Sequence, residues 1–407
     1  MRNALVAIGL ALSGSVVADA QWPQWRGPSR DGIAPAANVP ASWPDNPTLR
    51  WKQPVGEGYS SPVVDGGRVF VHSRQDPRET VSAFDLASGK PLWRASYDAG
   101  FTKNPYATEM AKGPFSTPLV ASGRVYTLGV TAVLSAFNAL TGALVWRKDF
   151  SKEIDTSKLF TGTAMSPIIA SGVLIVHTGD DDAGALRAFD PASGAEKWAL
   201  TGHGPGYASP VLTGSAPRQL ITMTDKAVVS VDVANGTLLW SLPWPDEFNE
   251  NIVTPVVAGD VLILSGTRKG TFGYRLENNG GKWTPKQIWQ NADLPMYMST
   301  PVADGAILFG FSNRRKGQLF CLDARTGTAK WTTEGRAGTN ASLLSAGPNL
   351  VVLTTEGEML VLRRNPDMYE ELRRYQLATS HTWAHPALLS AAVVVRDADS
   401  LSVWALK

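Results

Sequence analysis

Residues 323–331 read Asp323-Ala-Arg-Thr-Gly327-Thr-Ala-Lys-Trp331, and versions of this stretch recur along the chain. The Asp side chain can accept backbone N–H groups inside a turn, and the glycine supplies the positive φ at its end. The stretch therefore predicts a tight turn that leads into a strand carrying a tryptophan. The other turns of this kind are residues 85–89, 138–142, 190–194 and 232–236, whereas residues 277–281 depart from the pattern as Glu-Asn-Asn-Gly-Gly.

Each turn belongs to a longer unit of four short strand-like segments. In the first unit Ser61-Pro62 opens the first segment and Trp93 lies in the fourth. A proline at the first position of a strand loses no necessary ladder bond. Units lie 42 to 56 residues apart, which is the size of one four-stranded propeller blade. The other openings are Thr117-Pro118, Ser166-Pro167, Ser209-Pro210, Thr254-Pro255 and Thr300-Pro301, with weaker versions at Ser342-Leu343 and His385-Pro386; the other tryptophans are Trp146, Trp198, Trp240, Trp289 and Trp331, with Tyr375 in the seventh unit.

The two ends of the repeat array complete one another. Residues 385–407 contain three strand candidates and no fourth, and residues 49–52 (Leu-Arg-Trp-Lys) match the fourth strand of a unit. Pairing the two would leave no open edge. The sequence predicts an all-β, eight-bladed β-propeller of four-stranded blades over residues 49–407, with the N-terminal strand closing the last blade. Because the last two units are degenerate, seven blades are the alternative.

The first twenty residues have the features of a secretion signal, with Arg2 before an apolar stretch and Ala18-Asp19-Ala20 as a cleavage site. A membrane anchor is the alternative, although the stretch is shorter than the ~20 residues that a bilayer needs. No cysteine follows to carry a lipid. We expect a periplasmic or secreted protein without a lipid anchor or transmembrane segment, with residues 21–48 as an extension. A formal net charge of +2 indicates no nucleic-acid partner, and we expect a monomer.

The Asp-x-x-Thr-Gly-x-x-x-Trp pattern resembles the tryptophan-docking repeat of the quinoprotein (PQQ-like) propeller superfamily over residues 49–407. One branch comprises PQQ-dependent alcohol dehydrogenases, and the cofactor-free branch is typified by BamB of outer-membrane β-barrel assembly. Residues 22–28 also resemble the start of many secreted PQQ-like proteins. We interpret them as an extended arm whose two tryptophans pack on the side of the propeller, with a role in a site as the alternative.

The resemblance implies that a dehydrogenase would need adjacent cysteines, acidic and amide ligands for calcium, an arginine for the quinone and an Asp base. The single cysteine, Cys321, precludes the cysteine pair, and we expect it to be buried. We therefore expect neither PQQ nor calcium, and we assign no catalytic residue. A carboxylate pair spanning two blades stays open.

Two further groups were weighed as metal ligands. His381 and His385 lie four residues apart, but Pro386 follows at once and no Glu follows His381. The residues 180–182, all Asp, lack the alternation of a calcium loop, and we expect them in a solvated turn. We therefore predict no metal site. His72 and His177 occupy equivalent places in their units, which favours a structural role.

The long connections between strands must all emerge on one face, because strands alternate in direction. Binding residues favour such loops. One residue of each unit lies three positions before the proline (Leu343 in the seventh unit) that opens the first strand. These eight residues should form a ring at the mouth of the channel, with residues 97–118 overhanging it. Their composition suits a protein-binding hot spot or a stacked planar ligand, and packing between blades is the alternative. The ring comprises Tyr59, Phe115, Ala164, Tyr207, Ile252, Met298, Asn340 and Trp383, of which Tyr59, Phe115, Tyr207, Met298 and Trp383 are the candidate binding residues.

A second candidate surface is basic. Neighbouring units carry Arg268-Lys269 and Arg314-Arg315-Lys316 in equivalent loops, which should place five cations together at one rim. They would suit an acidic partner, with a solvated surface as the alternative. We therefore expect a scaffold that binds a protein partner in the cell envelope, resembling BamB. A PQQ-dependent dehydrogenase-like enzyme and a carbohydrate or small-ligand binder at the channel mouth are the alternatives.

Overall fold

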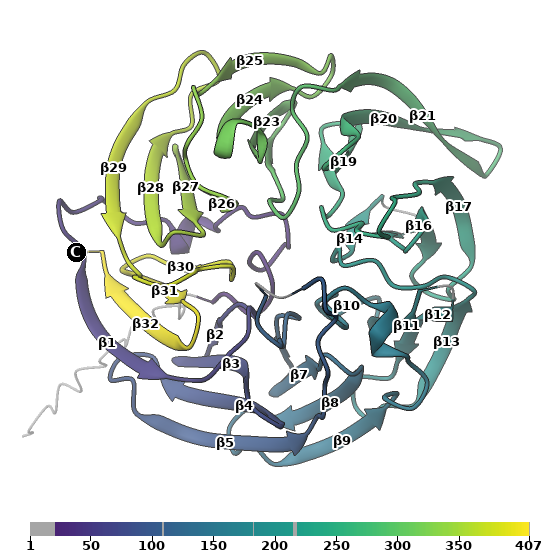
Figure 1. Cartoon of the computed structure of the whole chain (residues 1–407), viewed down its shortest axis with the longest axis vertical. Helices are drawn as coiled ribbons and strands as arrows, with labels where there is room; N and C mark the ends of the chain where they lie inside the picture. Colours follow the sequence, from purple (N-terminus) through teal and green to yellow (C-terminus); the bar gives the residue numbers. More distant parts are fainter. Residues whose placement is uncertain (1–20, 108–109, 182, 215–217, 407) are drawn as a thin grey trace, which may run out of the picture.

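The computed structural model describes residues 21–107, 110–181, 183–214 and 218–406. The predicted signal, residues 1–20, and Asp182 lie outside this part. Eight four-stranded antiparallel sheets are arranged around a central axis (Figure 1), which confirms the predicted eight-bladed propeller and excludes seven blades. The described residues contain three single-turn 3-10 helices, η1 (Ala36–Asn38), η2 (Thr156–Lys158) and η3 (Arg314–Lys316). Within that part, no helix has the length and apolar character to cross a membrane.

Seven blades consist of four consecutive strands, ordered from the axis outward. Blades one to four are β2 (Val63–Asp65), β3 (Arg68–Gln75), β4 (Arg78–Asp85) and β5 (Pro91–Asp98); β6 (Leu119–Ala121), β7 (Arg124–Leu128), β8 (Val133–Asn138) and β9 (Leu144–Asp149); β10 (Ile168–Ala170), β11 (Val173–Asp180), β12 (Ala183–Phe189) and β13 (Glu196–Thr201); β14 (Val211–Thr213), β15 (Gln219–Met223), β16 (Ala227–Asp232) and β17 (Leu238–Pro243). Blades five to seven are β18 (Val256–Ala258), β19 (Val261–Gly266), β20 (Gly270–Asn279) and β21 (Lys282–Asn291); β22 (Val302–Asp304), β23 (Ile307–Ser312), β24 (Gln318–Asp323) and β25 (Thr328–Thr332); β26 (Ala341–Ala346), β27 (Asn349–Thr354), β28 (Glu358–Arg363) and β29 (Glu371–Gln376).

The eighth blade joins the two ends of the chain. It contains β30 (Ala387–Leu389), β31 (Ala392–Arg396) and β32 (Ser400–Ala405), with β1 (Thr48–Pro54) as the outer strand. The β1–β32 pairing runs from Thr48 opposite Ala405 to Pro54 opposite Ser400. The predicted closure by the N-terminal strand is therefore confirmed.

The repeated tryptophans join each blade to the next one. The indole N–H of Trp51 donates to the carbonyl of Leu86 at 2.9 Å. A Cβ on Gly89 would lie 2.6 Å from the Trp51 ring, and Gly89 has a φ of +71°, so the turn needs glycine for two reasons. The same bond joins Trp93 to Ala139, Trp146 to Pro191, Trp198 to Val233, Trp289 to Ala324 and Trp331 to Asn365.

The fifth blade departs from this scheme because it lacks the repeated turn. The long hairpin of β20 and β21 stands in the place of that turn. Trp240 of the fourth blade therefore has no such turn to bind, and its indole N–H donates to the side chain of Gln219 in the fourth blade itself. Tyr375 takes the tryptophan position of the seventh blade, as the sequence indicated, and its hydroxyl donates to the carbonyl of Pro44 at 2.6 Å.

A buried arginine bridges the seam between the last and the first blade. Arg396, at the end of β31, is 1% exposed. Its guanidinium donates to the carbonyls of Ser60 and His72 at 2.9 and 2.6 Å, and to those of Gly56 and Glu57 at 3.2 and 2.7 Å. Burial lowers the pKa of Arg396 to about 9. One side chain of the eighth blade thus binds three carbonyls of the connection between β1 and β2 and one carbonyl of β3.

The N-terminal arm, residues 21–34, crosses the end of the channel. Trp22 pairs with Val64 in the first blade, the guanidinium of Arg30 donates to the carbonyl of Pro210 before the fourth blade, and the amide of Ala34 donates to the carbonyl of Ser345 in the seventh blade. In Figure 1 this purple segment passes behind the blades. Trp22 is buried, but Trp25 lines the channel cavity. The interpretation of both tryptophans as side packing is therefore wrong for Trp25, because the arm turns under the axis.

Candidate binding site at the channel mouth

The repeated Ser or Thr before the proline joins the innermost strands around the axis. The backbone amide of Ser61 donates to Thr117 Oγ1 at 3.1 Å, and the amide of Thr117 donates to Ser166 Oγ at 3.0 Å. Sequence reasoning explained only the proline and missed this role of the hydroxyl. The same bond runs from His385 to Ser61, from Ser166 to Ser209, from Ser209 to Thr254 and from Thr254 to Thr300. A belt of amide–hydroxyl bonds therefore positions the loops at the mouth.

Seven of the eight predicted ring residues line one cavity of about 150 Å³ at the axis; these are Tyr59, Phe115, Ala164, Tyr207, Ile252, Met298 and Trp383. Asn340 lines the larger cavity above it, which it shares with Met298 and Trp383. The Tyr59 ring lies 5.8 Å from that of Phe115 and 5.7 Å from that of Trp383 between centroids. The structure thus brings these residues together at the mouth, and the binding role assigned to them stays a prediction.

Two of the ring tyrosines also hold the overhanging loops. The amide of Ala111 donates to Tyr59 Oη at 3.2 Å, and the amide of Phe160 donates to Tyr207 Oη at 2.6 Å. Burial raises the pKa of both phenols. The two phenols therefore position the loops, so removing either ring would disturb the shape of the mouth as well as its surface.

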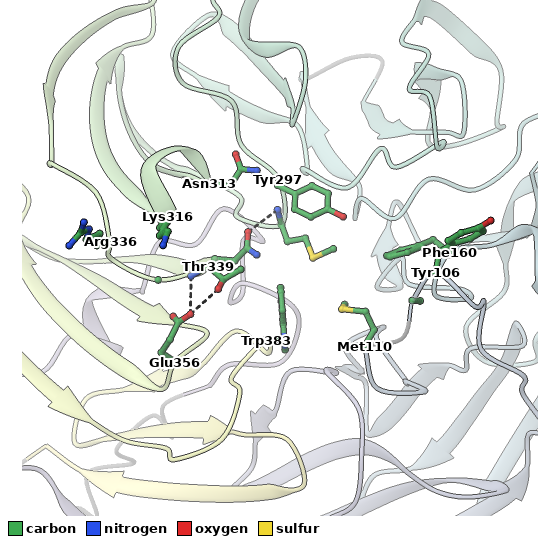
Figure 2. Close-up of a pocket in the computed structure, with 14 residues that line it drawn as sticks. Tyr106, Met110, Phe160, Tyr297, Asn313, Lys316, Arg336, Thr339, Glu356 and Trp383 are labelled. Carbon is green, nitrogen blue, oxygen red and sulfur yellow. Dashed lines mark hydrogen bonds between the residues drawn. The ribbon is translucent and has the colours of Figure 1, made fainter.

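The larger cavity, of about 1030 Å³, is a groove with two unlike ends. Figure 2 shows Phe160, Tyr106, Met110 and Tyr297 on one side of Trp383, and Lys316 and Arg336 on the other. Sequence reasoning placed the 97–118 loop over the mouth, where Tyr106 and Met110 do line the groove. Sequence reasoning missed Phe160 and Tyr297, because these two residues belong to no repeated position.

The basic loops meet only in part as expected. The side-chain amide of Asn313 donates to Thr267 Oγ1 at 3.1 Å, so the two loops are neighbours. Arg268, however, pairs with Glu247 at 3.0 Å and lies over Phe248, and Lys269 lies over Trp244. The segment before β18 thus holds these two cations, and the patch of five cations stays a prediction.

The basic end of the groove is formed by Lys316 with Arg336, and Arg314 and Arg315 line a separate hollow beside it. The amide of Arg336 donates to the carbonyl of Arg315 at 3.0 Å. Arg315, Lys316 and Arg336 have φ values of 54°, 63° and 65°. A left-handed backbone at a residue other than glycine is held in place by surrounding contacts, so this end of the groove has a defined shape.

The residues present do not fit a calcium–quinone site. Cys321 lies in β24 and is fully buried, and burial raises its pKa to about 12. Among the described residues that line the groove, the one carboxylate is that of Glu356, which accepts the amide and hydroxyl of Thr339. Across the described residues, no three His, Cys, Asp or Glu side chains are grouped to hold a metal ion.

Of the two histidines weighed as metal ligands, His381 is exposed and His385 is buried. His385 lies 5.4 Å from the ring of Trp25, and burial lowers its pKa to about 3. Asp180 is buried and accepts the amide of Asp155 at 2.6 Å, so the expectation of a solvated turn is wrong for this residue. His72 contacts Glu79 and the hydroxyl of Tyr97 inside the first blade, and His177 contacts the carbonyl of His203 at 2.9 Å.

Comparison with known proteins gives a consistent result. The model of the family described as outer membrane protein assembly factor BamB matches residues 77–333. A relative of that name from Yersinia pestis is 28% identical over 53% of this chain and 55% of its own length, and one from Shewanella oneidensis is 25% identical over 70% of each. The chain thus spans about half of the first relative. The crystal structure of a quinohemoprotein alcohol dehydrogenase from Comamonas testosteroni superimposes with a TM-score of 0.70 at 14% identity, over 95% of this chain and 80% of that one, which shows the shared fold alone.

Proposed function

This chain belongs to the family described as outer membrane protein assembly factor BamB, and from that membership we propose that it is an envelope scaffold that binds a protein partner during the assembly of outer-membrane proteins. The observation that supports this proposal is the groove at the channel mouth. Its apolar side chains lie on loops that the blades position, and their composition is that of a protein-binding hot spot.

The shape of the groove suits an extended segment of the partner. About 1030 Å³ is more than one side chain fills, and the groove runs from the aromatic residues around Trp383 to the cations Lys316 and Arg336. An extended peptide with apolar side chains at one end and an acidic residue at the other complements both ends. The phenols of Tyr59 and Tyr207 hold the loops that border it.

Replacing Trp383 and Met298 by alanine should weaken binding of the partner at least about thirtyfold. The truncation removes the apolar centre of the groove, and a hot-spot residue contributes about 2 kcal/mol or more, which is roughly thirtyfold in affinity. The partner is first captured from envelope extract on the full chain and identified by mass spectrometry. Its affinity for the purified variants is then measured by calorimetry, and cells lacking the protein are assayed for folded outer-membrane proteins.

Leu140→Ala and Met368→Ala form the matched control, because both residues are exposed apolar side chains in turns of the opposite face. Unchanged affinity in the Trp383 and Met298 variant, or an equal loss in the control, would contradict the proposed groove.

The basic end of the groove is tested separately. Lys316→Glu with Arg336→Glu should slow association of the partner and reduce the dependence of the association rate on salt.

We also propose that the chain performs no quinone chemistry. The lone buried thiol of Cys321 supports this, and so does the presence of one carboxylate, that of Glu356, among the described residues that line the groove. After incubation with PQQ and calcium, the purified protein should show no quinone absorbance and no dye-linked oxidation of alcohols. Stoichiometric uptake of PQQ together with turnover would overturn this part of the proposal and favour the dehydrogenase-like alternative.

A further inference from the structure

The small cavity beneath the groove is lined by a belt of buried hydroxyl groups. Each is at most 5% exposed, and each oxygen already accepts a backbone amide of the neighbouring blade. Among the residues that the structure describes, none of these hydroxyls donates to a protein acceptor. Six O–H protons therefore remain for whatever occupies the cavity. The belt comprises Ser61, Thr117, Ser166, Ser209, Thr254 and Thr300.

Among the described residues, His385 adds an unpaired ring nitrogen at the floor of this cavity, and Arg26 and Arg30, which line the separate hollow beyond Trp25, add positive charge beneath it. His385 lines the cavity at 9% exposure, and its Nδ1 has no hydrogen-bond partner. Below it, Arg26 and Arg30 lie 5.5 and 5.6 Å from the centroid of the Trp25 ring. Arg26 donates to the carbonyl of Pro301, and Arg30 to those of Pro167 and Pro210.

The two arginines have no carboxylate partner within the described part of the chain. Arg26 acts on the cavity electrostatically, because its charge contributes to the lowered pKa of His385. Carbonyl groups solvate a guanidinium without neutralising it, and the charge of Asp31, which raises the pKa of Arg26 against the larger lowering by burial, offsets only part of the positive charge of the pair. The floor therefore favours an anion above it.

We propose that this cavity is a binding site for the carboxylate of a small aromatic acid, separate from the groove for a protein partner. The carboxylate takes the hydroxyl belt, since its two oxygens accept several hydrogen bonds and donate none. The aromatic body lies in the collar formed by Tyr59, Phe115 and Trp383. A cavity of about 150 Å³ is the size that holds a benzene ring in an engineered protein.

The test compares three ligands that share one aromatic body and differ in charge. Phenylacetate, phenylacetamide and phenethylamine are titrated into the full chain by calorimetry. Phenylacetate should bind at least about tenfold tighter than the amide, because hydrogen bonds to a charged acceptor are the stronger ones. Phenethylamine should not bind. Equal affinity for acid and amide, binding of the amine, or no saturable binding of phenylacetate up to about 10 mM would overturn the proposal.

Two matched variants assign the site to the belt. Ser209→Ala removes a belt hydroxyl that accepts the amide of Ser166 at 3.1 Å, and Ser299→Ala removes a buried hydroxyl that accepts the amide of Ala341 at 2.9 Å away from the cavity. Affinity for phenylacetate should fall about tenfold in the first variant and stay unchanged in the second. An equal loss in both would overturn the assignment. The ligand series needs no variant and no protein partner, so its outcome is distinct from that of the proposed function.

Discussion

A chain that lacks residues 21–54 should not form a stable monomer. The deletion removes β1, so β32 is left with an unpaired edge, and exposed edges template association. It also removes Trp51, whose burial at 7% exposure contributes on the order of 2–3 kcal/mol, and net domain stability is only about 5–15 kcal/mol. Size-exclusion chromatography and scanning calorimetry should show aggregates and no cooperative transition.

The matched control is a chain that lacks residues 21–46. It keeps β1 and the bond from Trp51 to Leu86, while it loses the arm that crosses the channel. This chain should remain monomeric and unfold cooperatively at a lower temperature. A longer deletion that is as monomeric and stable as the shorter one would show that β1 does not close the ring.

Replacing Arg396 by methionine should lower the free energy of unfolding by about 3 kcal/mol or more. Methionine fills part of the space but donates nothing to the four carbonyls. The carbonyl of Glu57 keeps the amide of Arg74 at 2.8 Å, whereas those of Gly56, Ser60 and His72 lose the guanidinium, and each buried acceptor left without a partner costs about 1–3 kcal/mol. The loss is measured by urea denaturation of the full chain.

Arg363→Met serves as the control for this prediction. Arg363 pairs with Glu370 at 2.9 Å on the surface, and exposed ion pairs contribute roughly 0–1 kcal/mol. If both variants lost the same free energy of unfolding, the hydrogen bonds of Arg396 across the seam would stabilise the fold no more than a surface ion pair does.

The repeat alone determined the architecture of this protein. Asp323, Gly327 and Trp331 mark a turn and a docking tryptophan whose chemistry is local, and residues 49–52 complete the last blade because a closed ring has no other partner for them. The repeat register also located the residues at the mouth. Tyr59 and Trp383 lie far apart in the sequence, yet they occupy equivalent places in their units, and equivalent places meet around an axis.

Only the tertiary structure decided how side chains outside the repeat are used. The arm carries Trp25, Arg26 and Arg30 beneath the axis, where their partners come from several blades. The segment before β18 supplies Phe248 and Trp244 as contacts of Arg268 and Lys269. No periodic signal indicates such contacts, because each depends on where an irregular segment lies against blades that are distant in sequence. The belt hydroxyls were visible as a pattern, but their orientation toward the cavity is set by ring closure.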